Sequence, residues 1–333
     1  MSEAKTATAT EAATDLTNHE PTMRAISQDH LGGPEVLHEI ELPVPKPAPG
    51  QILVRIRAAG VNPTDWKHRS GAGFLPAPPF VLGWDVCGVV EKVGVGVTLF
   101  KPGDEVFGML PYPYGVGSHA EFVVGPTRAF ASKPKNIDDV EAGALPLVSL
   151  TAWQALVDTA EVGQGDRVLI HAAAGGVGHV AVQIAKARGA HVIGTASAPK
   201  HDFVRELGAD EVIDYRETDV AEAVKDVDIV LDTLGGDNQL KSLESLRTGG
   251  VLVSTLPFPK RGLFAEAATR DIRVELILVE ADHTGMLAIR ELVETDRLRA
   301  RIDKTFPLSR AAEAHRVGEA GHTTGKIVLT MEE

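Results

Sequence analysis

Hydrophobic and polar residues change their spacing at about residue 140 of the 333-residue chain. Up to about Phe130, short runs rich in Val and Ile are separated by Gly and Pro, as at 51–57, 88–93 and 120–124. Such runs predict a β-rich barrel or sandwich. From Ala144 onward, strand-length apolar runs alternate with longer segments of helical spacing, which predicts βαβ units around a parallel sheet.

The second part of the chain predicts a doubly wound nucleotide-binding domain of the Rossmann type, because it holds six strand-like runs. These runs lie at 167–172, 191–196, 211–214, 228–232, 251–255 and 274–279. Helical segments at 284–295 and 310–317 and a last strand at 326–330 follow. This end of the chain is expected to rejoin the first domain.

The predicted fold class is therefore α/β, with a Rossmann doubly wound parallel sheet and a β-rich second domain. Residues 147–282 are expected to form the Rossmann domain, and residues 23–146 together with 283–333 the β-rich domain. Residues 1–22 are rich in Thr and Ala, have no apolar stretch and no Arg, and predict a disordered tail rather than a signal or transit peptide.

Composition narrows the range of partners. The 46 acidic and 33 basic side chains give a formal charge of −13, which repels phosphate backbones and anionic lipid, so no nucleic-acid or membrane partner is expected. The apolar runs are shorter than the roughly 20 residues that cross a bilayer. Cys87 is the single cysteine, which excludes an intrachain disulfide and favours a cytoplasmic location.

A glycine-rich turn joins the strand at 167–172 to a helix. Gly175 lets backbone amides approach a pyrophosphate, Gly178 lets the helix lie close to the strand, and the helix N-terminus supplies the positive end of its dipole. Ala173 stands where the usual fingerprint has its first Gly. We expect a dinucleotide to bind this turn at Ala174, Gly175, Gly176, Val177 and Gly178.

The residues after the second strand of this domain predict which dinucleotide binds. A carboxylate at this place would hold a ribose 2′-hydroxyl, but the strand at 191–196 is followed by Ser197 and Lys200. A hydroxyl and a cation suit a 2′-phosphate, so NADPH (NADP) is the expected cofactor. Tyr215, after the third strand, is expected near the same phosphate. The alternatives are a solvated Lys200 and a Tyr215 that packs at the sheet edge.

Several motifs in a fixed order resemble the zinc-independent quinone oxidoreductase branch of the medium-chain dehydrogenase/reductase (MDR) superfamily. The resemblance covers the chain from Met23 to its C-terminus and implies that the β-rich domain is a GroES-like catalytic domain. The motifs are Gly60-Val61-Asn62-Pro63-Thr64-Asp65, Gly83-Trp84-Asp85-Val86-Cys87-Gly88, Lys101-Pro102-Gly103-Asp104-Glu105-Val106, Leu150-Thr151-Ala152-Trp153 and the Ala-rich turn.

The zinc-bearing relatives carry a Cys, a His and a Glu at positions where this chain has Asn62, Trp84 and Asp85. A catalytic zinc needs three protein ligands and an open position, so no metal is expected. Without a Lewis acid, the substrate must itself accept hydride readily. Quinones and α,β-unsaturated carbonyls meet this condition.

The resemblance implies roles for residues on both sides of the cofactor. Asn62 is expected to lie beside the nicotinamide and position it or the substrate, Asp65 to order the Asn62 loop, and Thr151 to touch the cofactor. Lys326, in the last strand, either extends to the cofactor or is an exposed strand lysine.

Aromatic residues are expected to shape the substrate pocket. Related quinone reductases often carry a Tyr where Phe74 follows the Arg-Ser-Gly turn, and Tyr112 or Tyr114 of the next Gly/Pro-rich loop is an alternative proton donor or pocket wall. Phe258 and Phe264 follow the fifth strand, and ligands bind at the carboxyl ends of parallel strands.

Two other functions remain open from the sequence alone. An enoyl-thioester or alkenal reductase would share the cofactor, the fold and the absence of zinc. A non-catalytic NADPH-binding redox sensor would bind the cofactor without turnover. By resemblance, two copies of the chain are expected to pair through the sixth strand, 274–279, as a homodimer.

Overall fold

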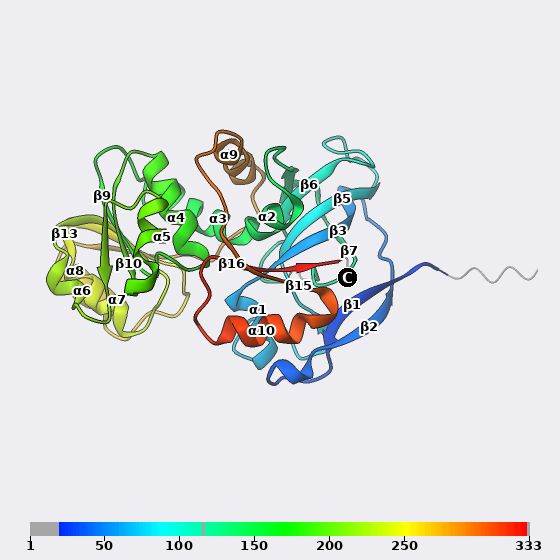
Figure 1. Ribbon diagram of the computed structural model, residues 1–333, viewed down its shortest axis with the longest axis horizontal. Helices are drawn as coiled ribbons and strands as arrows, with labels where there is room; N and C mark the ends of the chain where they lie inside the picture. The colour runs from blue at the N-terminus through cyan, green and yellow to red at the C-terminus, as the bar shows by residue number, and fades with distance from the viewer. Residues whose placement is uncertain (1–19, 115–116, 332–333) are drawn as a thin grey trace, which may run out of the picture.

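The computed structural model describes residues 20–114 and 117–331, which form two lobes side by side (Figure 1). One lobe holds a six-stranded sheet, and the other holds a seven-stranded and a three-stranded sheet. Of the predicted tail, residues 1–19 lie outside the described residues. Its last residue, Thr22, already begins a strand, and Glu20 forms an ion pair with Lys46.

The six-stranded sheet is parallel throughout, in the order β11-β10-β9-β12-β13-β14, which is the doubly wound order of a Rossmann sheet. The predicted six strands are therefore confirmed. Their bounds are β9 Arg167–Ile170, β10 His191–Ala196, β11 Glu211–Asp214, β12 Val227–Asp232, β13 Leu246–Ser254 and β14 Arg273–Leu276.

Three of these strands end earlier than predicted: β13 by one residue, β9 by two and β14 by three. β9 stops at Ile170 because the chain turns at Ala172, which has a φ of 50° that no strand residue adopts. β14 stops at Leu276, and the apolar residues 277–279 that continue the predicted strand line a cavity instead. Apolar character alone does not show where hydrogen bonding to a neighbouring strand stops.

The other lobe is built around β3, which pairs with β5, β7 and β16. The closing strand β16 runs antiparallel to β3 and parallel to β15, so the end of the chain rejoins the first lobe as predicted. The strands of this lobe are β1 Thr22–Gln28, β2 His38–Pro43, β3 Gln51–Val61, β4 Phe80–Val81, β5 Asp85–Val93, β6 Glu105–Met109, β7 Phe122–Pro126, β8 Phe130–Ser132, β15 Ile302–Pro307 and β16 Lys326–Thr330.

Helices cover the parallel sheet and fill the junction of the lobes. Helix α4 follows the glycine-rich turn with a buried apolar stripe, as its spacing predicts. The helices are α1 Pro63–Ser70, α2 Asp139–Ala144, α3 Pro146–Trp153, α4 Gly176–Ala187, α5 His201–Glu206, α6 Val220–Ala223, α7 Asp237–Ser242, α8 Leu263–Thr269, α9 His283–Glu294 and α10 Ala311–Glu319.

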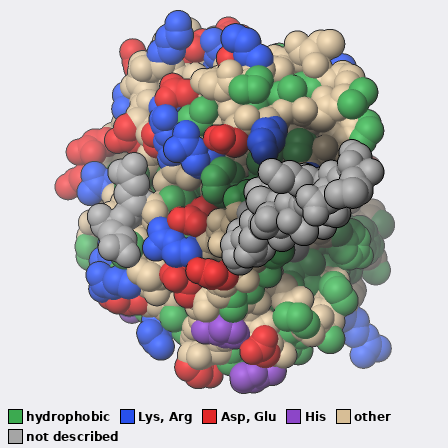
Figure 2. Space-filling view, turned by 90° about the vertical axis from the view of Figure 1, so that its right-hand side faces the viewer, with side chains coloured by type: hydrophobic (Ala, Val, Ile, Leu, Met, Phe, Trp, Pro, Cys, Tyr) green, Lys and Arg blue, Asp and Glu red, His purple; other side chains and the backbone are tan. Residues whose placement is uncertain are grey.

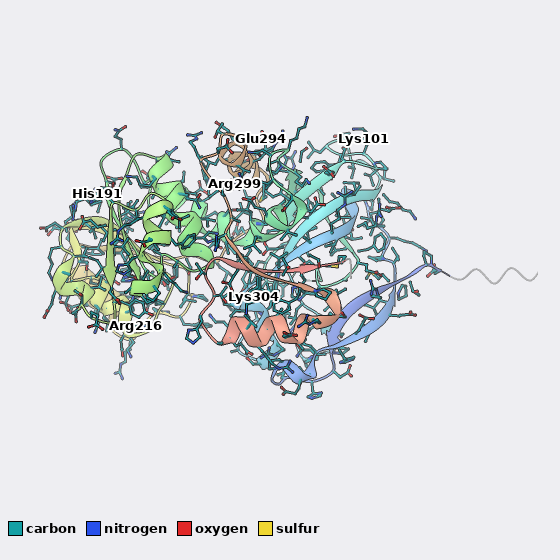
Figure 3. All side chains as sticks on the ribbon, viewed as in Figure 1. Lys101, His191, Arg216, Glu294, Arg299 and Lys304 are labelled. Carbon is teal, nitrogen blue, oxygen red and sulfur yellow. The ribbon has the colours of Figure 1, made fainter. Side chains whose placement is uncertain are left out.

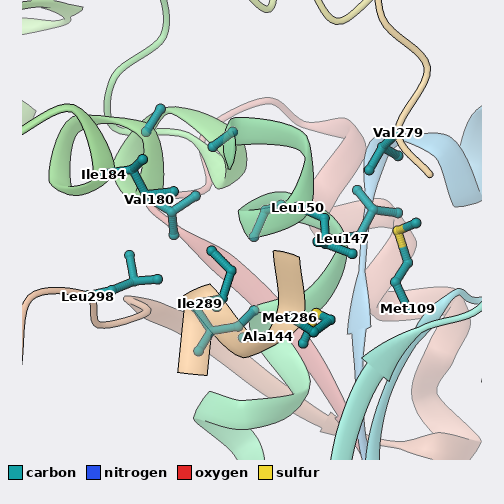
Figure 4. Close-up of a cluster of buried hydrophobic side chains, with 14 of the residues drawn as sticks. Met109, Ala144, Leu147, Leu150, Val180, Ile184, Val279, Met286, Ile289 and Leu298 are labelled. Carbon is teal, nitrogen blue, oxygen red and sulfur yellow. The ribbon is translucent and has the colours of Figure 1, made fainter. Parts of the chain in front are cut away.

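A buried hydrophobic cluster holds α3, α4 and α9 together where the two lobes meet (Figure 4). Because these side chains belong to one continuous core, the lobes share hydrophobic packing in addition to polar contacts, such as those of Lys200 with the carbonyls of His322 and Thr323. The domain boundaries at 147 and 282 fall beside this cluster and stay a prediction. The members labelled in Figure 4 include Leu147, Leu150, Val180, Ile184, Met286 and Ile289.

The end of the molecule that carries the three-stranded sheet shows acidic and basic side chains interspersed rather than separated into patches (Figure 2). Among the helices described, none has the length and apolar character needed to cross a bilayer.

Candidate active site

A cavity of about 760 Å³ lies where the phosphate turn of one lobe faces the Asn62 loop of the other. Its volume is in the range of cofactor and small-molecule sites. One wall consists of the glycine-rich turn and the carboxyl ends of β12 and β13, and the opposite wall of α1, its following loop and β16. Predicted site residues in the lining are Asn62, Phe74, Tyr112, Thr151, Gly175, Gly176, Val177, Gly178, Phe258 and Lys326.

The glycine-rich turn has little room for side chains. A Cβ on Gly178 would lie 2.2 Å from the carbonyl oxygen of Ala172 and 2.7 Å from the Cα of Ala173. Close approach of α4 to the turn therefore requires glycine at 178, as predicted from the sequence. Ala174 is 4% exposed, and its carbonyl accepts a hydrogen bond from Gly325 N (2.9 Å) rather than facing the cavity.

Asn62 is the centre of a buried polar network on the opposite wall. Its Nδ2 donates to Oδ2 of Asp85 (2.8 Å), and its Oδ1 accepts from Nζ of Lys326. Lys326 also donates to Val61 O (3.2 Å) and lies 3.5 Å from Asp85 Oδ2. The other Asp85 oxygen accepts from Leu147 N (2.6 Å). Lys326 thus fixes the Asn62 amide from the closing strand, and the alternative of an exposed strand lysine is wrong because its side chain is 2% exposed.

Asp65 orders the start of α1. Its Oδ2 accepts from the backbone N of Asn62 (2.6 Å), which satisfies a donor that the helix leaves free. Burial, with a further contribution from the charge of Asp85, raises the pKa of Asp65 to about 7. Burial also raises the pKa of Asp85 and lowers that of Lys326, while their opposite charges act against both shifts.

The residues at the positions of the zinc ligands do not fit a zinc ion. Trp84 is fully buried and has no ligand atom, and the oxygens of Asn62 and Asp85 already face the Lys326 ammonium. A divalent cation there would compete with a buried positive charge. Across residues 20–114 and 117–331, no three His, Cys, Asp or Glu side chains lie together so that they could hold a metal ion.

The residues predicted to contact a 2′-phosphate lie together beyond β10 and β11 but outside the cavity lining. Ser197 is 8% exposed, and Lys200 donates to the carbonyls of His322 and Thr323 (3.0 Å each). Tyr215 is half exposed, and the guanidinium of Arg216 lies 5.7 Å from its ring centroid. Figure 3 shows Arg216 at the edge of this lobe.

The substrate side of the cavity is aromatic. Phe74 and Phe258 come from different lobes and stack across the opening, with centroids 6.3 Å apart and planes 16° from parallel. Tyr112 meets Phe74 edge to face at 6.4 Å. Phe264 lies on α8, is 53% exposed and does not line the cavity, since α8 turns it away. Tyr114 is 72% exposed and is also outside the lining.

Sequence reasoning missed cavity residues on α1 and at the C-terminal loop. Thr64 and His68 are four residues apart on α1 and both line the cavity. Thr323 lines it too, and its buried Oγ1 has no hydrogen-bond partner among the described residues. The sequence signal that could have identified Thr64 and His68 is their i, i+4 spacing on the helix after Asn62. No local pattern marks Thr323.

Comparisons with known proteins agree with this architecture. Residues 48–135 match the family described as alcohol dehydrogenase GroES-like domain, and residues 207–329 match the family described as zinc-binding dehydrogenase. The chain is 34% identical over 326 residues to a chloroplastic quinone-oxidoreductase, QR1, of Triphysaria versicolor, with 92% of this chain and 98% of that protein covered.

Two solved structures share the whole fold. The quinone oxidoreductase of Coxiella burnetii superposes with a TM-score of 0.88 at 37% identity, covering 94% of this chain and all of that one. The Escherichia coli quinone oxidoreductase complexed with NADPH superposes with a TM-score of 0.84 at 30% identity, covering 92% and 99%. The chain therefore belongs to the medium-chain dehydrogenase/reductase superfamily of oxidoreductases, with quinone oxidoreductases among its relatives.

Proposed function

We propose that this protein reduces quinones or α,β-unsaturated carbonyl compounds with NADPH, without a metal ion. The observation that carries the proposal is the cavity itself, which joins a glycine-rich phosphate turn to an aromatic substrate wall through the buried Asn62–Lys326–Asp85 network. The names of the Triphysaria and Escherichia coli relatives, a quinone-oxidoreductase and a quinone oxidoreductase complexed with NADPH, agree with it.

The residues of the cavity fit a bound dinucleotide. Gly175 and Gly176 present no side chain to the cavity, so phosphate oxygens can approach amide hydrogens at the start of α4. The unpartnered Oγ1 of Thr323 lies in the lining and would face the rest of the dinucleotide. The hydroxyl of Thr151, also in the lining, donates to the carbonyl of Leu147 (2.7 Å) and could therefore only accept from a bound ligand. When bound, NADPH supplies the hydride. The protein's own part is to orient the two reactants through Asn62 and to exclude solvent with the Phe74–Phe258 pair.

The preference for NADPH over NADH rests on charge. Lys200 and Arg216 lie near enough to influence each other electrostatically, and Ser197 offers a hydroxyl beside them. A 2′-phosphate would gain charged hydrogen bonds from this group. The homodimer also belongs to this proposal, and β14, at the edge of the parallel sheet, is available for pairing. The cytoplasmic location stays a prediction, since the name of the Triphysaria relative places that protein in a chloroplast.

The test measures oxidation of NADPH and, separately, NADH by metal-stripped protein with a benzoquinone, an enal and a simple ketone. We expect turnover with NADPH and the first two substrates only. Lys200→Ala should raise KM for NADPH about tenfold or more, as expected for losing a charged hydrogen bond, and leave NADH unchanged. Lys225→Ala is the matched control, because this exposed lysine lies just before β12 at the amino ends of the parallel strands, whereas Lys200 follows the carboxyl end of β10.

Three results would contradict the proposal in different ways. NADPH binding without turnover on any electrophile would favour a redox sensor. Activity that requires added zinc would overturn the metal-free reaction. Reduction of thioester substrates alone would favour the enoyl-thioester reductase.

A further inference from the structure

Tyr112 brings a hydroxyl group to the substrate side of the cavity from the loop that follows β6. Its ring packs against Trp84, His68 and Phe74, with centroid distances of 5.2, 6.0 and 6.4 Å. Its Oη lies 2.9 Å from Oγ1 of Thr64. Because three rings and one hydrogen bond hold it, the hydroxyl has one defined position in the cavity wall.

The hydrogen bonds around Thr64 indicate the direction in which Tyr112 donates. His68 Nδ1 lies 2.8 Å from the carbonyl oxygen of Thr64, which can only accept, so Nδ1 carries the hydrogen. The same Nδ1 is 3.1 Å from Thr64 Oγ1. Because Oγ1 accepts from the imidazole, its own hydrogen is available for Tyr112 Oη. When it is donated there, the hydrogen of Tyr112 points toward the cavity.

The remaining atoms of His68 agree with this assignment. Its Nε2 is buried without a hydrogen-bond partner among the described residues. This agrees with an Nε2 that carries a lone pair and no hydrogen. Burial lowers the pKa of His68, so the ring is neutral at physiological pH. Burial raises the pKa of Tyr112, so its hydroxyl keeps the proton until a base arrives in the cavity.

We propose that Tyr112 is the proton donor of the reduction, with Thr64 and His68 as positioning residues that aim its hydroxyl at the substrate oxygen. This inference rests on the proposed function, because it needs a substrate that becomes an oxyanion. It assigns the donor to the loop after β6, whereas the position after the Arg-Ser-Gly turn holds Phe74, which has no hydroxyl.

With an enone, bound NADPH would supply a hydride from C4 of its nicotinamide, and this hydrogen with both electrons would form the new C–H bond at the substrate β-carbon. The electron pair displaced from the C=C bond moves to the carbonyl oxygen, which becomes an enolate. That oxygen takes the proton of Tyr112, and the phenolate recovers a proton from solvent after the product has left the cavity. A quinone would take the hydride and its two electrons at one carbonyl oxygen; the ring becomes aromatic, and the other oxygen takes the proton of Tyr112, which gives a hydroquinone.

The test compares two substrates whose oxyanions differ in basicity. Wild type, Tyr112→Phe, Thr64→Val and Tyr114→Phe are assayed with NADPH and either an enone or a benzoquinone, in water and in deuterium oxide. Phe at 112 keeps the ring contacts and removes only the hydroxyl. Tyr114→Phe is the matched control, because Tyr114 is in the same loop but 72% exposed and outside the cavity lining. Binding of NADPH reports that each variant is folded.

Tyr112→Phe should lower kcat with the enone by about 10²-fold or more, a typical loss for a general acid, with little change in KM. Its loss with the benzoquinone should be about tenfold or less, because a hydroquinone anion is a weaker base than an enolate. Thr64→Val should lose about tenfold with the enone, and the solvent isotope effect seen with wild type should disappear in Tyr112→Phe. Tyr114→Phe should match wild type.

Equal losses on both substrates would show that Tyr112 only packs, and would overturn the assignment. Unchanged activity of Tyr112→Phe would do the same. If wild type binds NADPH but reduces neither substrate, the proposed function itself has failed. If Tyr112→Phe does not fold, Thr64→Val decides by the same comparison, since a larger loss with the enone than with the quinone supports the donor and equal losses overturn it.

Discussion

Replacing Lys326 with methionine tests whether the buried network holds the active-site loop in place. Lys326 is 2% exposed and Asp85 is fully buried, with 3.5 Å between Nζ and Oδ2. At this distance, and with an effective dielectric constant near 20, two unit charges attract by about 5 kcal/mol. Removing one partner of a buried pair typically costs about 3 to 5 kcal/mol. We therefore expect Lys326→Met to lower the free energy of unfolding by about this amount.

The assay is urea unfolding followed by tryptophan fluorescence, with linear extrapolation to water. In the double variant Lys326→Met/Asp85→Asn, both charges are gone. Its loss in the free energy of unfolding should be smaller than the sum of the two single losses by at least about 2 kcal/mol, which is the coupling energy of the pair. The loss in the single variant should also shrink as pH falls. Asp85, without its counter-ion, takes up a proton in the folded state more readily than in the unfolded chain.

The control is Lys304→Met, in the neighbouring strand β15, where the lysine is exposed (Figure 3). Its effect should stay within about 0.5 kcal/mol. A loss below 1 kcal/mol in Lys326→Met, on the order of a surface pair, would refute the reasoning. So would a double variant that loses the full sum of the two single losses, since the two charges would then be independent.

Two further predictions concern the phosphate turn and the buried histidines. Gly178→Ala places a Cβ 2.2 Å from the Ala172 carbonyl oxygen, so α4 must move. We therefore expect weaker NADPH binding and a stability loss of about 1 to 3 kcal/mol. In the control Gly163→Ala, the Cβ would meet nothing closer than 3.8 Å, and both quantities should stay unchanged. A Gly178→Ala protein with wild-type affinity would contradict the close fit. The second prediction is that the melting temperature falls as the pH is lowered from about 6.5 to 4.5. Burial lowers the pKa of His119, His171 and His179 to about 4 each, so in this range the unfolded chain binds more protons than the folded one, and each histidine withdraws up to about 3 kcal/mol by pH 4. Asp65, whose pKa is raised to about 7, works in the opposite direction and offsets about one histidine. A melting temperature that stays constant or rises across this range would show that the histidines are not buried as neutral rings.

The parallel sheet could be predicted because its signal is local. Each strand of the Rossmann sheet is a short apolar run bounded by turn residues, and the strands occur in the sequence order that the doubly wound topology requires. Strand ends were less certain, as at β9 and β14, because an apolar residue after a strand serves equally well as cavity lining. The closing strand β16 was predicted from the sequence, but its burial on both faces was not predicted.

The polar network of the site could not be worked out from spacing. Lys326 and Asn62 are 264 positions apart, and their contact exists only because β16 pairs with β3. The resemblance to quinone oxidoreductases pointed to Asn62, but the residue that orients its amide comes from the far end of the chain. In the same way, the Tyr112–Thr64 hydrogen bond joins a loop to a helix 48 positions earlier.

The two walls of the cavity differ in how much change they tolerate. The cofactor wall is made of backbone, and a single Cβ at 178 collides with atoms that cannot move separately from the sheet. The substrate wall is made of side chains such as Phe74 and Phe258, which are 37% and 68% exposed and can change size without disturbing a core. Loop side chains of this kind vary at little cost in stability. We therefore expect relatives with about one third of their residues in common to keep the dinucleotide site and to differ in the electrophile they accept, so that Phe74, Tyr112 and Phe258 decide which substrate this protein reduces.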